Sequence, residues 1–186
     1  GCLVNGFKNI WQAEQITLAI SNDTTVCYGF NAKVVASATG GIQPYDFQWS
    51  VPNPTGWDTL EVVATSTQTY TVDVFDFNGC TPAQESMTLT VIPLVDIVVL
   101  QDTTICPGGT ATLTAQGING LPGYSYMWSN GETTPTINVK PSSTTTYTAT
   151  VTDQCGDDAS ADAVVDIHSL PTVQFEADSL IGCTPL

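Results

Sequence analysis

The stretch DTTVC at residues 23–27 occurs a second time as DTTIC at residues 102–106, which is 79 residues further along the chain. The aromatic stretch that follows also recurs at this distance, since Trp49-Ser50 matches Trp128-Ser129. The distance shortens only beyond the tryptophans, which indicates that one loop differs in length while the strands keep their register. A period of this size corresponds to one small domain, so the sequence predicts a tandem array.

Aligning the repeats with each other predicts two complete domains and two partial ones. The complete repeats are expected at residues 14–92 and 93–170, with a proline near each junction to stiffen the linker. Residues 1–13 are expected to end a preceding repeat, and residues 171–186 to begin a following one. The chain is therefore expected to be a segment of a longer protein.

Apolar and polar residues alternate with a period of two wherever the repeats match, as in YTVDV at residues 70–74 and YTATVT at residues 147–152. Glycine, proline and asparagine separate these stretches about every ten residues, and no stretch carries a helical period over three turns. The pattern predicts an all-β chain of tandem Ig-like β-sandwiches.

One strand in each repeat is rich in aromatic residues. Tyr45, Phe47 and Trp49 share one face of this strand, and Trp128 ends its counterpart in the second repeat. We expect Trp49 and Trp128 to be buried between the sheets, because each repeat has one strong aromatic strand from which to build a core. The alternative is an exposed row on which sugars stack. Trp57, in the loop that has no counterpart, is a candidate ligand contact, although packing against its own sandwich is favoured.

The six cysteines indicate disulfides and hence an oxidising compartment. Two cysteines lie at matching positions in each complete repeat, which predicts one disulfide per repeat. The sequence offers no Cys-x-x-Cys pair and a single histidine, which disfavours a metal site. Cys2 and Cys183 are expected to pair outside the chain, and the predicted pairs within repeats are Cys27–Cys80 and Cys106–Cys155.

Charge is strongly unbalanced, with 18 acidic residues against three lysines and no arginine, for a net charge of −15. This excludes nucleic acid and anionic membrane surfaces as partners, since both require cationic patches. No apolar run is long enough for membrane insertion of this segment. The expected partners are neighbouring repeats of the same chain, surface polysaccharide or other filament subunits.

The sequence contains no catalytic constellation, and the chain is predicted not to be an enzyme. The sole histidine, His168, lies in a linker, and the motifs of serine hydrolases, zinc proteases and phosphate loops are absent. No cofactor is expected. Asp153, Asp157 and Asp158 are a candidate Ca²⁺ site near a domain end, but a solvated acidic turn is favoured because the oxygen spacing of a Ca²⁺ loop is missing.

The second repeat carries a resemblance to a known group. Its segments DTTICPGGTATLTA, YMWSNG and PSSTTTYTATVTD, within residues 102–155, resemble the Ig-like and PKD-like repeats of large Bacteroidota cell-surface proteins, such as the SprB-like gliding-motility adhesins. Residues 50–69 depart from that pattern. The resemblance implies type IX secretion to the cell surface and a structural or adhesive role in the stalk of a surface filament. The alternatives are a carbohydrate-binding module and a spacer in a secreted multidomain enzyme.

The same resemblance implies a modification. Exported proteins of this group are O-glycosylated at Asp followed by Ser or Thr and then a small or aliphatic residue or Thr. The alternative is that Asp-Thr only caps a turn at the start of a strand. The implied glycosylation sites are Thr24, Thr59, Thr103 and Ser179.

Overall fold

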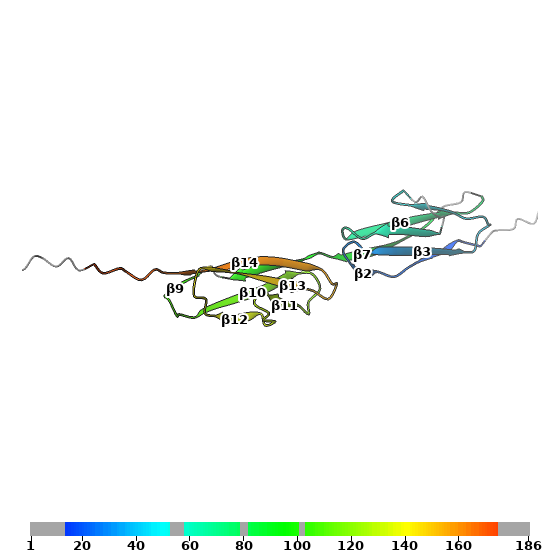
Figure 1. Cartoon of the computed structure of the whole chain (residues 1–186). Coiled ribbons are helices and arrows are strands. Elements are labelled where there is room, and N and C mark those ends of the chain that lie inside the picture. Colours follow the sequence, from blue (N-terminus) through cyan, green and yellow to red (C-terminus); the bar gives the residue numbers. More distant parts are fainter. Residues whose placement is uncertain (1–13, 53–57, 79–81, 101–102, 175–186) are drawn as a thin grey trace, which may run out of the picture. The chain divides into compact units, whose positions relative to one another are not determined.

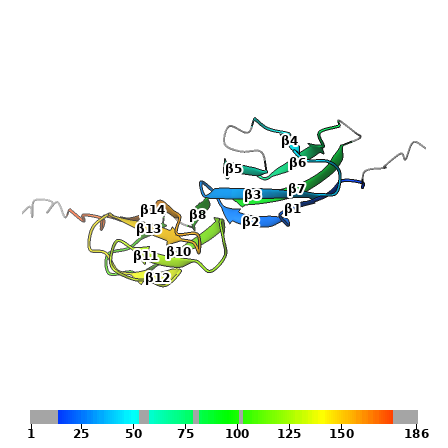
Figure 2. The same cartoon turned by 90° about the vertical axis from the view of Figure 1, so that its right-hand side faces the viewer.

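The structure is a computed structural model that describes residues 14–52, 58–78, 82–100 and 103–174. The chain divides into two compact units, and the division falls between Leu94 and Val95. Every regular element of the described residues is a β-strand (Figures 1 and 2). The all-β prediction is therefore confirmed. The partial repeats expected at the two ends fall wholly or mostly outside the described residues.

The first unit is a sandwich of two sheets. One sheet has the order β1-β3-β5 and the other has the order β2-β7-β6-β4. Neighbouring strands are antiparallel except β2, which runs parallel to β7. The seven strands are β1 (Thr17–Ile20), β2 (Thr24–Cys27), β3 (Asn31–Thr39), β4 (Asp46–Trp49), β5 (Thr59–Val63), β6 (Gln68–Phe75) and β7 (Ala83–Ile92).

The second unit repeats this topology strand for strand. Its sheets have the orders β12-β10-β8 and β11-β13-β14-β9, and β9 runs parallel to β14. Two facing sheets of three and four strands with this order form an Ig-like sandwich, which confirms the predicted fold. The strands are β8 (Val95–Leu100), β9 (Thr103–Ile105), β10 (Ala111–Asn119), β11 (Ser125–Trp128), β12 (Thr136–Val139), β13 (Thr145–Thr152) and β14 (Asp158–Ile167).

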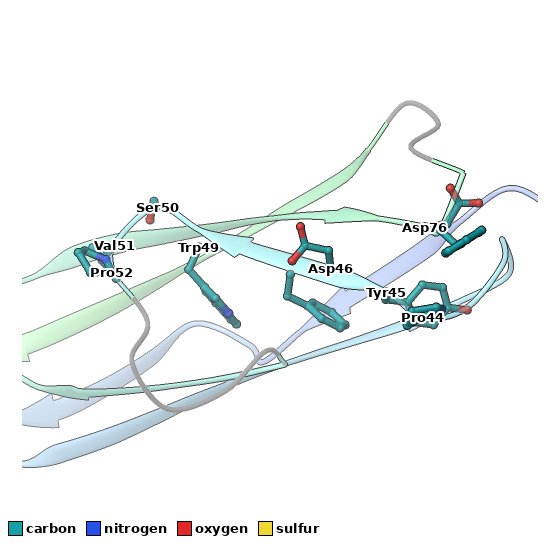
Figure 3. Close-up of a pocket in the computed structure, with 10 residues that line it drawn as sticks. Pro44, Tyr45, Asp46, Trp49, Ser50, Val51, Pro52 and Asp76 are labelled. Atoms are coloured by element: carbon teal, nitrogen blue, oxygen red, sulfur yellow. The ribbon is translucent and has the colours of Figure 1, made fainter.

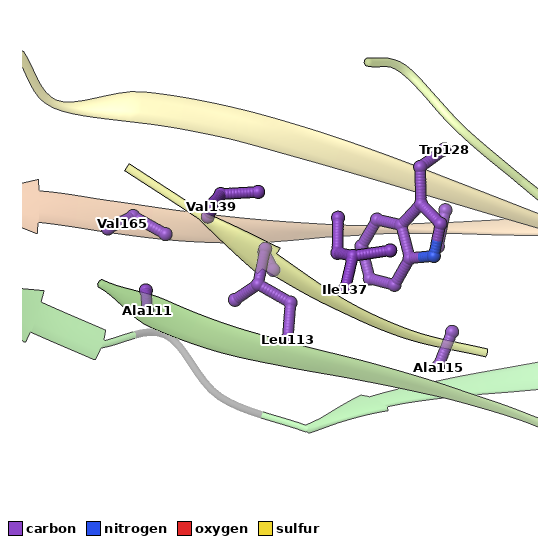
Figure 4. Packing of buried hydrophobic residues seen from close by; sticks show 9 residues of the cluster. Ala111, Leu113, Ala115, Trp128, Ile137, Val139 and Val165 are labelled. Carbon is purple, nitrogen blue, oxygen red and sulfur yellow. The ribbon is translucent and has the colours of Figure 1, made fainter. Parts of the chain in front are cut away.

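Both sheets of the second unit contribute to one apolar core. Leu113 and Ile137 come from the three-stranded sheet, whereas Trp128, Ala149 and Val165 come from the four-stranded sheet. Figure 4 shows the indole of Trp128 against Ile137 in the interior of the unit. Full burial of a branched aliphatic side chain contributes about 1.5–3 kcal/mol, so this contact between the sheets is a main source of the stability of the unit.

The two tryptophans of the aromatic strands are buried to different extents. Trp128 is 1% exposed and donates a hydrogen bond from Nε1 to the carbonyl of Thr134 at 2.9 Å, which confirms the prediction for the second repeat. Trp49 is only half-buried, so the prediction is wrong there. Trp128 lies opposite Ala149 in the ladder, whereas Trp49 lies opposite Val72. The smaller alanine leaves room beside it for the indole.

The outer face of the hairpin formed by β13 and β14 carries polar pairs across the strands. These pairs use the threonine, serine and aspartate residues that alternate with the core residues, as expected for a sheet with one solvated face. The hydrogen bonds join Thr148 to Asp162 (2.7 Å), Thr150 to Ser160 (2.8 Å) and Thr152 to Asp158 (2.6 Å).

The difference between the tryptophans predicts the effect of filling the space beside Trp128. Ala149→Val should destabilise the second unit by about 1–3 kcal/mol, because the added methyl groups compete with the buried indole for volume. Amide hydrogen exchange resolved on β11 and β13 measures this loss of stability. The matched control is Ala19→Val on the exposed face of β1, which should have little effect. Equal protection of β13 in Ala149→Val and in the parent chain would contradict the packing account.

Candidate functional site

An open cleft of about 660 Å³ follows β4 of the first unit (Figure 3). Its volume lies within the range of small-molecule sites. The lining combines the aromatic residues of β4 with residues that follow β6, among them Asp76 and Phe77. The cleft is therefore the candidate ligand site of the first unit.

The aromatic side chains on β4 and immediately before it form the edge of the core. Tyr45, Phe47 and Trp49 are each half-buried and pack against the apolar cluster that includes Leu18 and Val72. The rings of Tyr45 and Phe47 meet edge to face, with centroids 6.4 Å apart and planes at 80°. This arrangement favours the core interpretation of the aromatic strand over an exposed row for sugar stacking.

The polar side chains along β4 are engaged within the unit. The hydroxyl of Tyr45 donates to the carbonyl of Gly40. Asp46 accepts a hydrogen bond from the side-chain amide of Gln48 at 2.8 Å. Ser50 Oγ accepts a hydrogen bond from the backbone N–H of Thr71 at 3.1 Å. A ligand would have to compete with these hydrogen bonds. The polar groups of the cleft therefore stabilise the unit itself, which disfavours the cleft as a recognition site.

Buried aspartates hold the turn after the sixth strand of each unit. Asp76 is 7% exposed and Asp153 is 6% exposed, and the two residues match in the repeat. Asp76 accepts hydrogen bonds from the backbone N–H groups of Ile42 (3.2 Å) and Asn78 (3.1 Å). The carboxylate of Asp153 accepts from the N–H of Asp157 at 3.0 Å. The match of these two aspartates in the repeat is the sequence signal for this shared role.

Of the three aspartates predicted as a Ca²⁺ candidate, Asp153 and Asp157 are brought together and Asp158 is not part of the group. The side-chain ligand atoms of Asp153, Cys155 and Asp157 lie within 4.8 Å of one another, whereas Asp158 accepts a hydrogen bond from Thr152 across the hairpin. Cys155 is disulfide-bonded, so its sulfur is not a thiolate. The carboxylate of Asp153 is hydrogen-bonded to the backbone N–H of Asp157. Residues 153–157 therefore form a turn that is capped by this carboxylate.

This turn predicts different effects for two neighbouring aspartates. Asp153→Ala should destabilise the second unit by about 1–3 kcal/mol, because the partly buried N–H of Asp157 loses its acceptor. Asp157→Ala is the matched control and should have a small effect, because the turn uses the backbone of Asp157. Denaturant unfolding with and without a chelator measures both. Equal losses in the two variants, together with destabilisation by the chelator, would indicate a bound cation instead.

The cysteines of the second unit do not form the predicted pair. Cys27 and Cys155 are each disulfide-bonded, and Cys106 is exposed and free. The predicted pair Cys106–Cys155 is therefore wrong. The reason is strand polarity: Ile105, next to Cys106, pairs with Ile167 at the end of β14, and Cys155 precedes the start of that strand. The 10 residues of β14 span about 33 Å, and this length separates Cys155 from Cys106. The Cα atoms of a disulfide lie at most about 7 Å apart.

The predicted pair in the first unit stays a prediction. Cys27 is disulfide-bonded and lies beside Ile92 at the end of β7. Its predicted partner, Cys80, lies outside the described residues.

The remaining predicted residues lie on the surface or outside the described residues. Thr24 is exposed, and Thr59 and Thr103, at the first positions of β5 and β9, are half-buried. The carboxylate of Asp23 accepts a hydrogen bond from the N–H of Thr88 at 2.7 Å, so Asp-Thr also has a structural role at that strand. Trp57 and Ser179 lie outside the described residues.

His168 is exposed, and its backbone N–H donates to the carbonyl of Ile105 at 2.9 Å. This bond continues the pairing of β9 with β14 beyond the end of the strand. In the described part of the chain, no helix is long and apolar enough to cross a membrane.

A family model matches part of the first unit. Residues 17–53 match the family model described as the SprB repeat, and no enzyme family is indicated. No curated protein matches the chain in sequence.

Solved structures of Ig domains are similar in fold. The four N-terminal Ig domains of Dscam1 isoform 6.9 match with a TM-score of 0.46 and 14% identity, over 87% of this chain and 48% of that one. The eight N-terminal Ig domains of Down Syndrome Cell Adhesion Molecule (DSCAM) isoform 1.30.30 match with a TM-score of 0.49 and 13% identity, over 83% and 25% of the chains. The chain thus spans less than half the length of these structures. The fold assignment rests on the strand order and the packing of the two units.

Proposed function

We propose that this chain, which matches the SprB repeat over residues 17–53, is a stalk segment of a long extracellular surface filament or adhesin. Its role is mechanical: it spans distance and carries an adhesive region away from the cell. Neighbouring repeats are its main partners, with surface polysaccharide or other filament subunits as further ones. The observation that carries the proposal is the family match inside a unit whose seven-strand topology recurs in the next unit.

The polarity of each unit supports a spacer role. Because β2 is parallel to β7, and β9 to β14, the chain enters a unit at one end of the sandwich and leaves it at the other. Units with this polarity can be joined in series without a return connection. Repeat proteins of this kind extend by adding units, and each unit keeps its own core.

The chemistry of the described residues supports a role without catalysis. His168, the one histidine of the sequence, is an exposed residue at the end of a strand. The polar side chains along β4 are already hydrogen-bonded within the unit, which favours a stalk over a carbohydrate-binding module. Only three lysines and no arginine occur in the chain, so trypsin-like proteases find few sites.

The proposal predicts that intact cells producing the parent protein are labelled by an antibody raised against this chain. In immunogold electron microscopy, the gold particles should lie away from the cell envelope, because the repeats hold the epitope at a distance from it. The control is an antibody against a cytoplasmic protein, which should label only permeabilised cells. Labelling by the repeat antibody that also required permeabilisation would refute the extracellular stalk.

We further propose that Thr24, Thr59, Thr103 and Ser179 carry O-linked glycan in the native protein. Thr24 supports this because it is exposed at the first position of β2. Sugars near the ends of the repeats would shield linkers from proteases and hold neighbouring stalks apart.

Intact-mass analysis of natively produced protein tests the modification. The expected mass exceeds that of the polypeptide by whole glycan units, and Thr24→Ala should remove one unit. Thr25→Ala, at the next residue of the same strand, is the matched control and should leave the number of glycans unchanged. A native mass equal to that of the bare polypeptide, less the hydrogens lost in disulfides, would contradict the proposal. Asp-Thr would then only cap a turn.

A further inference from the structure

We propose that the parallel ladder of β2 and β7 carries tension through the first unit, and that the side chain of Asp23 strengthens this ladder. The ladder joins Thr24–Cys27 to Leu89–Ile92, and the two strands lie side by side in Figures 1 and 2. The inference rests on the proposed stalk role and names the contact that bears the load in it.

The two strands of this ladder come from opposite ends of the unit. β2 follows β1 at the start of the unit, and β7 is its last strand. Because β2 runs parallel to β7, tension between the ends of the unit pulls the two strands in opposite directions along their shared axis. The hydrogen bonds of a ladder run between the strands, so this pull loads all of them together. An antiparallel hairpin pulled at its two open ends would instead lose its hydrogen bonds one at a time.

The final residues of β7 depend on β2 for their strand pairing. β6 pairs with β7 only as far as Leu89, so residues 90–92 pair with β2 alone among the described strands. On the side away from β2, the backbone N–H of Val91 donates to the hydroxyl of Thr67 at 2.9 Å. Tension that arrives from the C-terminal side therefore reaches the ladder with β2 before it reaches the ladder with β6.

Hydrogen bonds extend the ladder of β2 and β7 beyond both of its ends. The carboxylate of Asp23 accepts a hydrogen bond from the backbone N–H of Thr88 at 2.7 Å, one residue before the ladder on each strand. At the other end, the backbone N–H of Tyr28 donates to the carbonyl of Ile92 at 3.1 Å. Hydrogen bonds to a charged acceptor are stronger than neutral ones. Asp23 thus adds a strong hydrogen bond where tension from the N-terminal side arrives.

The second unit has the same arrangement of strands. β9 pairs in parallel with the end of β14, and the backbone N–H of Ile167 donates to the hydroxyl of Thr144 at 3.4 Å, as that of Val91 does to a threonine in the first unit. Asp102 matches Asp23 in the recurring DTT motif, but it lies outside the described residues. The motif therefore precedes or begins the strand that bears the load in each repeat.

Stretching the purified chain from its two termini at constant force, with reductant present, tests the proposal. Protein produced in a host that adds no O-glycan excludes an effect of sugar at Thr24. A Gly-Ser insertion of about 15 residues between Ser142 and Ser143, in an exposed loop, lengthens the unfolding step of the second unit by roughly 5 nm. The steps of the two units can then be told apart, and the unfolding rate of the first unit is measured.

Asp23→Ala should raise the unfolding rate of the first unit under force about tenfold, because the ladder loses a hydrogen bond to a charged acceptor. Asp23→Asn should restore much of the resistance, because the amide oxygen can still accept from the N–H of Thr88. The matched control is Asp73→Ala, which removes a carboxylate that accepts at the same distance, 2.7 Å, but joins β6 to β7. It should leave the rate under force nearly unchanged.

A core variant separates bearing the load from stabilising the unit. Leu60 is 1% exposed on β5, which belongs to the other sheet and pairs with β3. Leu60→Ala should lower the denaturant midpoint more than Asp23→Ala does, whereas Asp23→Ala should unfold faster under force.

The same ranking of Leu60→Ala and Asp23→Ala in denaturant and under force would overturn the proposal. Equal rates under force for Asp23→Ala and Asp73→Ala would overturn it too, even if Leu60→Ala failed to fold. Neither result bears on whether the repeat antibody labels intact cells, so the failure of this inference is distinct from a failure of the proposed stalk.

Discussion

The parallel pairing of the second strand with the last strand is the constraint on which each unit depends. It places Cys27 beside Ile92 in the first unit and Ile105 beside Ile167 in the second. The remaining neighbours in the four-stranded sheets are antiparallel, so this one pairing fixes where the chain enters and leaves the sandwich. The proposed use of the unit as a spacer and the separation of Cys106 from Cys155 in the second unit both follow from it.

Within this common topology the two cores are packed differently. Val72 lies opposite Trp49, and Ala149 lies opposite Trp128, which is almost fully buried. Cores tolerate such exchanges when the total volume is kept, so one repeat pattern supports two packings. The half-buried Trp49 and the open cleft beside β4 are thus consequences of packing, and the hydrogen bonds of Tyr45 and Ser50 stabilise that edge.

The sequence was sufficient to predict the strands and the sandwich. Alternation in stretches such as residues 70–74 shows directly which side chains face the core, because the period of a strand is two. It was not sufficient for the disulfides. Spacing along the chain shows that Cys106 and Cys155 belong to one repeat, but the end of the sandwich at which each lies depends on strand polarity and pairing. The burial of Trp49 was overestimated for a related reason, since the extent of burial depends on the residue opposite in the ladder.

The proposed stalk role requires that the chain is a series of separately folded sandwiches that bear load from end to end. Single-molecule stretching from the two termini tests it most directly, with reductant present so that no disulfide limits extension. The account predicts two separate unfolding events, each lengthening the chain by roughly 25 nm, as expected for a domain of this size. One event releasing about twice that length, or a gradual extension without discrete steps, would contradict it.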